Sequence, residues 1–345
     1  MTDEHLINLF LELARLDGPS GKEAPVADYA INFLMKLGLP AGTDGAAGVS
    51  GSDTGNVVCP VDGGGEFVLL AHMDTARTTA ATRQVVTSDR VSSDGKAQLG
   101  ADNRAGMAAI LYAVERAVKA GLPLKPFTIA FTTQEETSMA GGLNLTLPAG
   151  VRHGFVFDSS LDPGAYAVAS PGAAIFTARV GGKPAHAGIA PEKGICAIRI
   201  AAHAIDALKF GRHDEDTTSN IGTIAGGEAT NVVPPSAVVK GEVRSLDLAK
   251  VPPILDQIKA GFEKAAAAAG GRSEFDWAWD FKPYRHAPDS EVCRLAAEAV
   301  KAAGLTPAPV PSHGGSDANS LNALGVATVN FGIGARNPHA DDEYI

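Results

Sequence analysis

A histidine and an aspartate two positions apart follow an apolar run, in the stretch Phe67-Val68-Leu69-Leu70-Ala71-His72-Met73-Asp74. The run is typical of a strand that is buried on both faces. Because residues i and i+2 of a strand point to the same side, we expect His72 and Asp74 to act together. A neutral imidazole can bind a metal ion, and a carboxylate on its other ring nitrogen would fix the tautomer. Alone, the pattern is weak, because a polar loop at the end of a strand looks the same.

Further carboxylates and a second histidine occur in similar positions, at or just beyond the ends of predicted strands or at the start of a helix. They are Asp102 before a helix that extends to about residue 120, Glu135 and Glu136 after the strand 125–132, Asp158 after the strand 154–157, and His339 shortly after the strand 327–332. In open α/β sheets, ligands bind beyond the carboxyl ends of the strands. Two histidines and several carboxylates there suit a divalent metal such as zinc. Alternatively, Asp102 caps its helix and the adjacent glutamates form a solvated loop.

Length and composition limit the kinds of protein that this chain can be. With 345 residues it exceeds the size at which a single core stops growing, so two domains are expected. Its 45% hydrophobic and 20% charged residues are typical of a soluble globular protein. The formal net charge of −10 argues against nucleic acid or an anionic membrane as the main partner. The sequence has no apolar run long enough for a bilayer and no glycine-rich phosphate-binding motif.

The cysteines and the N-terminal residues indicate a cytoplasmic protein. Cys59, Cys196 and Cys293 lie far apart and form no CxxC pattern, so neither a cysteine metal site nor a redox motif is visible. Sparse cysteine use fits a reducing compartment. Residues 1–15 mix acidic side chains with leucines, which predicts an amphipathic helix instead of a secretory signal.

The order of the predicted elements divides the chain into two domains. Residues 173–285 follow the order β-α-β-β-α-β, which is that of a ferredoxin-like α+β sandwich. We therefore expect them to be inserted into an α/β domain formed by residues 1–172 and 286–345. The predicted elements of the insertion are strands at 173–180, 219–224, 236–244 and 273–280 and helices at 194–209 and 251–269.

Two local patterns in the first domain also give predictions. Ser20 and Glu23 have the spacing of a capping box for a helix at 23–37. Strands at 56–61 and 66–72 flank the glycine-rich segment 62–65, which predicts a β-hairpin.

Together, these motifs resemble those of the M20 family of dinuclear zinc peptidases, and in particular those of its tripeptidase (peptidase T-like) members. They occur in the family's order over nearly the whole chain, and their combination is specific although each one alone is weak. The resemblance implies a zinc-exopeptidase-like catalytic domain with a mixed central sheet, and an inserted ferredoxin-like lid and dimerisation domain. The motifs are Ala71-His72-Met73-Asp74-Thr75, Gly100-Ala101-Asp102-Asn103, Gln134-Glu135-Glu136, Asp158, Gly182-Lys183-Pro184-Ala185-His186-Ala187-Gly188 and Asn337-Pro338-His339.

The resemblance implies two divalent metal ions. Zinc is the expected metal, and cobalt and manganese are the alternatives. Asp102 would bridge them. The remaining protein ligands would be His72 and Asp158 for the first ion, and Glu136 and His339 for the second.

The resemblance also implies catalytic roles. Glu135 would be the general base and acid that works with a metal-bridging hydroxide, and Asp74 would orient His72. The family often has a cis peptide after the bridging aspartate, which here is the bond Asp102–Asn103.

Residues of the inserted domain would bind the substrate. His186 would stabilise the oxyanion, often in the active site of a partner subunit, so that a homodimer would be part of the mechanism. Asn231 and Arg244 match other substrate binders of the family, and Arg244 suits a carboxylate by its bidentate geometry, although a surface ion pair is the alternative. The segment His313–Asp317 resembles a substrate loop of the family.

The sequence thus predicts a metal-dependent aminopeptidase that hydrolyses the N-terminal peptide bond of short peptides such as tripeptides. One alternative is an amidohydrolase of the same family that removes an acyl group from an amino acid, because the same groups cleave either amide. Another is a non-catalytic metal-binding homologue, against which the intact Glu135 argues. The sequence ends at Ile345, soon after His339, where relatives usually continue into a C-terminal helix.

Overall fold

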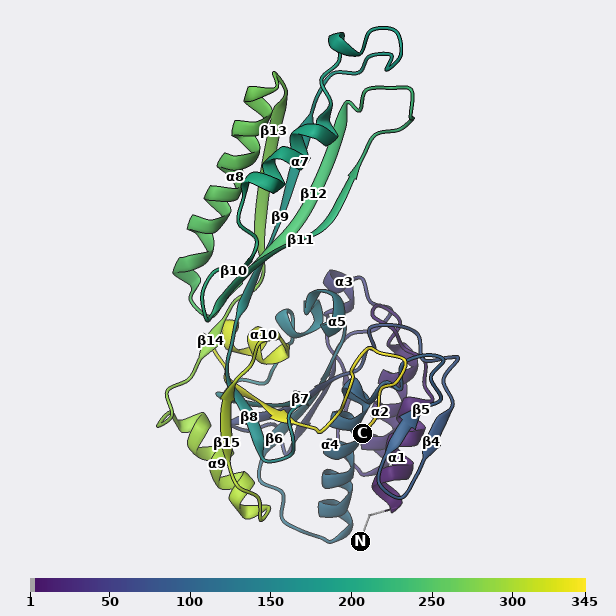
Figure 1. Cartoon of the computed structure of the whole chain (residues 1–345). Helices are drawn as coiled ribbons and strands as arrows, with labels where there is room; N and C mark the ends of the chain where they lie inside the picture. The colour runs from purple at the N-terminus through teal and green to yellow at the C-terminus, as the bar shows by residue number, and fades with distance from the viewer. Residues whose placement is uncertain (1–3) are drawn as a thin grey trace. The chain divides into compact units, whose positions relative to one another are not determined.

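The computed structural model describes residues 4–345, which divide into two compact units. Unit 1 is formed by the chain up to Ser170 and by Arg285–Ile345, and unit 2 is formed by Pro171–Tyr284. Each unit has its own β-sheet (Figure 1).

Unit 1 is built on a nine-stranded mixed sheet with the order β1-β2-β6-β3-β7-β16-β8-β14, in which β15 also pairs with β8. Its strands are β1 Gly42–Thr43, β2 Val57–Val61, β3 Phe67–His72, β6 Phe127–Thr132, β7 His153–Ser159, β8 Ala165–Ser170, β14 Tyr284–Arg285, β15 Ala308–Pro311 and β16 Ala327–Gly332, and a separate pair is formed by β4 Gln84–Val86 and β5 Val91–Ser93. Its helices are α1 Glu4–Ala14, α2 Ala24–Lys36, α3 Ala47–Ser50, α4 Ala101–Lys119, α5 Glu135–Ser138, α6 Ala140–Leu143, α9 Glu291–Ala302 and α10 Asp317–Ala323.

Four neighbouring strands at the centre of this sheet, β6, β3, β7 and β16, run parallel to one another. Their carboxyl ends therefore lie at one edge of the sheet, where ligands bind in α/β folds. Every residue of β6 is buried, and Val68 and Leu70 of β3 are inaccessible to solvent. The continuous apolar runs of the sequence thus form the interior of the sheet, and the polar residues that follow them are brought together at its edge.

Helices cover the sheet through apolar side chains spaced three or four residues apart. In α4 these include Met107, Leu111 and Val114, which share a buried cluster with residues of α1 and α2. The helix α10 packs against β7 and β16 (Figure 1), and an added Cβ at Gly154 would meet the Leu321 side chain. The core thus fixes both the strand ends and the start of α4.

The predicted hairpin between the strands at 56–61 and 66–72 is wrong. β6 lies between β2 and β3, antiparallel to the first and parallel to the second. The glycine-rich segment 62–65 therefore carries the chain past an intervening strand instead of closing a two-strand turn. An added Cβ at Gly65 would lie 1.9 Å from the carbonyl oxygen of Pro126, so this passage requires glycine.

The predicted capping box of Ser20 and Glu23 is also wrong. Glu23 makes no side-chain capping bond to α2. Its carboxylate accepts hydrogen bonds from the backbone N–H groups of Gly21 and Gln134, and the Ser20 hydroxyl donates to Asp74. The Ser20 side chain thus bonds to a partner that is distant in the sequence, and Glu23 bonds both to the nearby Gly21 and to the distant Gln134.

Unit 2 is a five-stranded antiparallel sheet with the order β10-β11-β12-β9-β13. The four long strands and two helices have the order and pairing of a ferredoxin-like fold, as predicted. α7 and α8 contact each other and both pack on β9 and β12 (Figure 1). The elements are β9 Gly172–Gly181, α7 Ala197–Ala207, β10 Gly211–Arg212, β11 Thr217–Gly226, β12 Ser236–Ser245, α8 Val251–Ala268 and β13 Arg272–Phe281, with 3₁₀ turns at Pro191–Lys193 and Leu248–Lys250.

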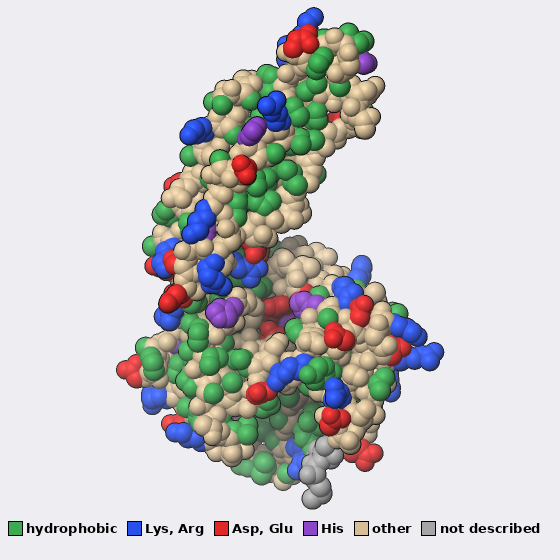
Figure 2. Space-filling view, viewed as in Figure 1, with side chains coloured by type: hydrophobic (Ala, Val, Ile, Leu, Met, Phe, Trp, Pro, Cys, Tyr) green, Lys and Arg blue, Asp and Glu red, His purple; other side chains and the backbone are tan. Residues whose placement is uncertain are grey.

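None of the helices in residues 4–345 combines the length and the apolar character needed to cross a membrane. On the face drawn in Figure 2, basic and acidic side chains are interspersed and form no continuous basic field.

We predict that Gly106→Ala lowers the stability of unit 1, although alanine is the better helix former. An added Cβ at Gly106 lies 2.1 Å from the carbonyl oxygen of Phe157 and 2.3 Å from Asn103 Oδ1. Overpacking costs about 1–3 kcal/mol, whereas helix propensity favours alanine by about 1 kcal/mol at most. The urea midpoint of unfolding should therefore fall. Gly48→Ala is the matched control in α3, because its added Cβ meets nothing within 4 Å; equal midpoints for the two variants would contradict the packing argument.

Candidate metal centre

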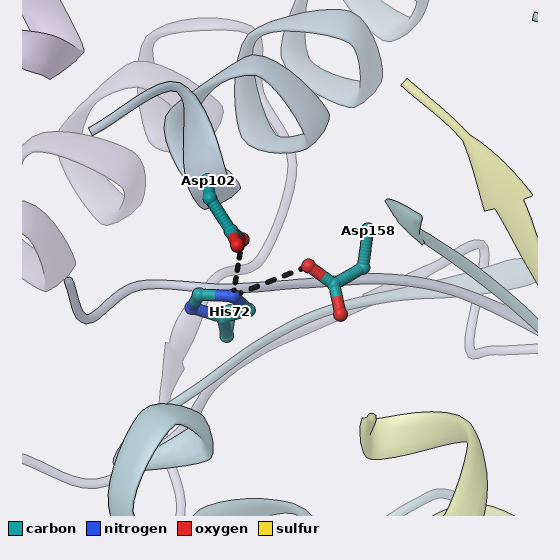
Figure 3. A group of neighbouring side chains, drawn as sticks. All are labelled: His72, Asp102 and Asp158. Atoms are coloured by element: carbon teal, nitrogen blue, oxygen red, sulfur yellow. Dashed lines mark hydrogen bonds and ion pairs between the residues drawn. The ribbon is translucent and has the colours of Figure 1, made fainter. Parts of the chain in front are cut away.

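His72, at the end of β3, lies between two carboxylates and is only 1% exposed. Its Nε2 lies 3.1 Å from Asp102 Oδ1 and 3.2 Å from Asp158 Oδ1 (Figure 3). Its Nδ1 lies 3.0 Å from the carbonyl oxygen of Asp74 and 3.3 Å from Asp74 Oδ1. One ring nitrogen thus contacts a supporting residue, while the other faces potential metal ligands. This arrangement is typical of histidines that bind metals.

His339 faces a second pair of carboxylates. Its Nε2 lies 2.8 Å from Glu136 Oε2 and 3.3 Å from Asp102 Oδ2, so each oxygen of Asp102 faces a different imidazole. Among residues 4–345, three groups of side chains have potential ligand atoms within 4.8 Å of one another, and the first and last of these groups share Asp102. The groups are His72, Asp102 and Asp158; His72, Glu135 and Glu136; and Asp102, Glu136 and His339.

Irregular backbone at the start of α4 directs Asp102 into this cluster. Asp102 has non-helical φ and ψ of −83° and 105°, and the peptide bond from Asp102 to Asn103 is cis, as the resemblance implied. Gly100 holds the N-cap position, with no side-chain capping bond there. The alternative in which Asp102 merely caps its helix is therefore excluded.

A turn after β6 directs Glu135 and Glu136 to the same side. Gln134 has a left-handed backbone with φ of 55°, and the helical turn α5 begins directly after it. Consecutive helical residues are separated by about 100° instead of the 180° of a strand. Glu136 reaches His339, and Glu135 Oε2 lies 4.0 Å from His72 Nε2.

Asp74 is buried and supports this turn as well as His72. Its Oδ1 accepts the backbone N–H of Glu135 at 3.0 Å, and its Oδ2 accepts that of Glu136 at 3.1 Å. The first N–H groups of a helix have no partner within the helix, so a carboxylate is a favourable acceptor there. One buried side chain thus fixes the positions of three residues of the cluster.

The cluster concentrates negative charge in a buried place. Burial, together with the charge of Asp158, raises the pKa of the Glu135 carboxyl well above its usual range, and His72 only partly opposes this rise. Burial also raises the pKa of Glu136 and of Asp158. Glu136 Oε1 is buried without a hydrogen-bond partner. Imidazole and carboxylate donors, excess negative charge and an unpartnered oxygen all fit divalent cations.

Unit 2 brings two of its three predicted site residues together. Ala187 N donates to Asn231 O, and His186 forms an isolated β-bridge with Val232. His186 and Asn231 are both exposed. Gly188 N donates to His186 Nδ1 at 3.2 Å, which leaves the ring proton on Nε2.

Arg244 lies at the other end of the same sheet. Ser236 of β12 pairs with Gly181, the last residue of β9 before the His186 loop, whereas Arg244 pairs with Ala173. The eight residue steps from Ser236 to Arg244, at about 3.3 Å each, separate these two ends of the sheet by about 26 Å. Arg244 Nε and Nη2 donate to the two carboxylate oxygens of Glu242 at 2.9 and 3.0 Å.

The sequence did not predict the residues that hold the cluster by hydrogen bonds to its main chain or to the supporting side chain of Asp74. Asn330, a polar residue within an apolar strand, was a signal of this kind, whereas the others have no local pattern. The missed contacts are Ser20 Oγ to Asp74 Oδ2 at 2.6 Å, Gln134 N to Glu23 Oε1 at 3.0 Å, Asp158 N to Asn330 Oδ1 at 3.1 Å and Arg77 Nη2 to His339 O at 2.6 Å.

The segment His313–Asp317 is partly structural. The Ser316 side chain accepts the N–H of Ala318 and, with Asn319, forms a capping box for α10. Asp317 is buried and bonds to the Thr132 hydroxyl. Burial raises the pKa of Asp317 to about 7.

Comparisons with known proteins agree with the fold. A family model described as a peptidase dimerisation domain matches residues 168–269. The uncharacterized protein YqjE of Bacillus subtilis is 33% identical over 99% of this chain and 94% of its own length. The solved aminopeptidase PepT from Bacillus cereus is 32% identical, with a TM-score of 0.88 over 99% of this chain and 93% of its own. A solved tripeptidase from Staphylococcus aureus is 30% identical, with a TM-score of 0.92 over 100% and 94%.

Two other proteins are similar over nearly the whole chain. An acetylornithine deacetylase from Myxococcus xanthus is 27% identical over 97% of this chain and 90% of its own length. The B. subtilis YXEP protein, described as a dinuclear metal-binding peptidase of the M20 family, shares the fold with a TM-score of 0.68 and 19% identity over 97% and 90%.

Full-length similarity to an aminopeptidase and a tripeptidase, together with the cluster of metal-binding side chains, defines a metal-dependent peptidase with an inserted dimerisation domain. The chain belongs to the M20 family, as its motifs suggested.

We predict that metal binding releases protons and becomes tighter as the pH rises. Hydrogen bonds with Asp102 and Glu136 raise the pKa of His339 to about 10, so its imidazole is protonated at neutral pH in the metal-free protein. A metal ion needs the neutral ring, and the proton must leave. Calorimetric titration with zinc in buffers of different ionisation enthalpy should show the release. His203→Ala, on the exposed side of α7, should leave it unchanged, whereas binding heats independent of buffer in the parent would contradict the prediction.

Proposed function

We propose that this chain is an aminopeptidase that hydrolyses the N-terminal peptide bond of short peptides, in particular tripeptides, with two divalent metal ions, zinc in the first place. The observation that carries the proposal is the pair of candidate metal groups that share Asp102, with Glu135 beside them. His72 and Asp158 would hold one ion, Glu136 and His339 the other, and Asp102 both.

Glu135 is the proposed general base and acid. When bound, the two ions would lower the pKa of water and polarise the substrate carbonyl. Glu135 would take a proton from this water and later deliver it to the leaving amine. Its raised pKa suits a group that must both accept and release a proton. Asp74 keeps Glu135 in place by accepting its backbone N–H, and it orients the ring of His72.

Substrate recognition is assigned to the inserted unit. His186, with its proton on Nε2, would donate to the developing oxyanion, and the neighbouring Asn231 would act beside it. Arg244 would bind a substrate carboxylate through the N–H groups that Glu242 does not use. His186 and Asn231 lie beyond the end of the sheet at Gly181 and Ser236, whereas Arg244 lies at the opposite end. This separation favours roles in different active sites of a homodimer formed through the inserted unit.

A deacylase is the second candidate function. The similarity to acetylornithine deacetylase over nearly the whole chain favours it, because the same centre cleaves an acyl amide. Recognition of a free α-amine separates the two functions.

We place the enzyme in the cytoplasm. Its three cysteines are free thiols, and two of them are buried. Free thiols are the usual state in a reducing compartment.

We predict metal-dependent release of the N-terminal residue from a free tripeptide, and no cleavage of an N-acetyl amino acid. A chelator should abolish the activity and zinc should restore it. Glu135→Gln should reduce kcat by about 10²–10⁴-fold, because it removes the proton carrier. Glu298→Gln, on the exposed face of α9, is the matched control. Cleavage of the acetyl compound alone would move the assignment to a deacylase, and activity on neither would contradict both.

We predict that two inactive variants restore activity when they are mixed as subunits. Glu135→Gln lacks the base, and His186→Ala lacks the proposed oxyanion donor. In a mixed dimer, one site would combine an intact Glu135 with His186 of the partner subunit. Random reassembly would then restore about a quarter of the parental activity, because half of the dimers are mixed and half of their sites are complete. No recovery after verified mixing would place His186 in its own subunit's site or outside catalysis.

A further inference from the structure

Glu343 is a fully buried carboxylate near the end of the chain that none of the assignments above uses. Its Oε2 accepts the backbone N–H of Gly100 at 2.8 Å, and its Oε1 accepts that of Asp102 at 3.0 Å. The two oxygens thus bind N–H groups on either side of Ala101, at the start of α4.

The segment that carries Glu343 is itself held firmly. Ile345 exchanges two backbone hydrogen bonds with Val91 of β5, at 2.7 and 2.8 Å, and Ser93 N donates to the carbonyl oxygen of Glu343 at 3.1 Å. Tyr344 and Arg336 also pair through their backbones. The Glu343 side chain therefore projects from an anchored strand-like segment, only four residues beyond His339.

Simple capping of α4 does not explain why this side chain is a carboxylate. Glu343 is buried close enough to Asp102 for the two negative charges to repel each other. A buried carboxylate is costly, and a second one nearby adds to the cost. An amide or water could satisfy a helix N-terminus without this repulsion. A carboxylate whose two oxygens accept from the N–H groups of Gly100 and Asp102, however, fixes the orientation of the backbone that leads into Asp102.

We propose that Glu343 is a positioning residue for metal binding. By holding the N–H groups of Gly100 and Asp102, it fixes the backbone from which the Asp102 carboxylate reaches both candidate metal groups. The segment 339–343 also carries His339, so one anchored piece of chain positions two of the proposed ligands. This inference rests on the proposed role of Asp102 as a shared metal ligand.

Two substitutions separate positioning from charge. Glu343→Gln keeps the shape but places an NH₂ group against one of the two N–H groups, so one hydrogen bond is lost. Glu343→Asp keeps the charge but is shorter by one methylene group and cannot reach both. Each variant should bind zinc about 10–100-fold more weakly, as is typical when a group that supports a metal ligand is removed. The Co²⁺ absorption spectrum should also shift.

The measurement is a competition titration of the metal-depleted full chain with Zn²⁺, together with the spectrum of its Co²⁺ form and the melting temperature without metal. Glu115→Gln is the matched control. Like Glu343, Glu115 is a largely buried carboxylate, but it lies within α4, away from Asp102, and accepts a hydrogen bond from Lys119. It should lower the melting temperature without changing metal affinity or the spectrum.

The outcomes are distinguishable. If the parent binds no Zn²⁺, or if Asp102→Asn binds it as tightly as the parent does, the proposed metal centre fails. If the parent depends on Asp102 but both Glu343 variants bind as it does, Glu343 has no positioning role. Parental affinity in Glu343→Asp alone would show that only the charge matters, which also overturns the proposal. If Glu343→Gln does not fold, Glu343→Asp decides by its affinity and spectrum.

Discussion

The candidate site of unit 1 depends on one electrostatic arrangement, in which the two oxygens of Asp102 face two imidazoles from distant parts of the chain. His72 and His339 lie 3.1 and 3.3 Å from these oxygens, and each histidine also faces another carboxylate. Such a density of buried carboxylates is unfavourable unless cations compensate it. The parallel strands bring these groups together because their carboxyl ends share one edge of the sheet, and the core beneath them keeps them there.

The site is held largely through its main chain. Asp74 binds the N–H groups of Glu135 and Glu136, Glu23 binds that of Gln134, and Glu343 binds those of Gly100 and Asp102. Buried acceptors therefore fix the turn after β6 and the start of α4, where regular secondary structure cannot place the side chains. The positions of the candidate metal-binding side chains are thus set by buried residues outside the candidate metal groups.

The sequence predicted most of the elements and the cluster, because both depend on local patterns and strand order. Apolar runs located β3, β6 and β16, and the β-α-β-β-α-β order identified the inserted unit. The hairpin prediction failed because β6, which is distant in the chain, lies between β2 and β3. The capping box predicted for Ser20 and Glu23 was wrong, because Ser20 bonds to the distant Asp74 and Glu23 to the distant Gln134 instead of capping the helix. Glu343 could not be predicted, since its spacing from Asp102 carries no periodic signal.

Diffraction from crystals grown with zinc, with anomalous data at the zinc edge, would test the shared role of Asp102 directly. We predict two ions for each chain, with Asp102 between them, His72 and Asp158 on one ion, and Glu136 and His339 on the other. A single ion, or two ions that do not share Asp102, would contradict the central claim.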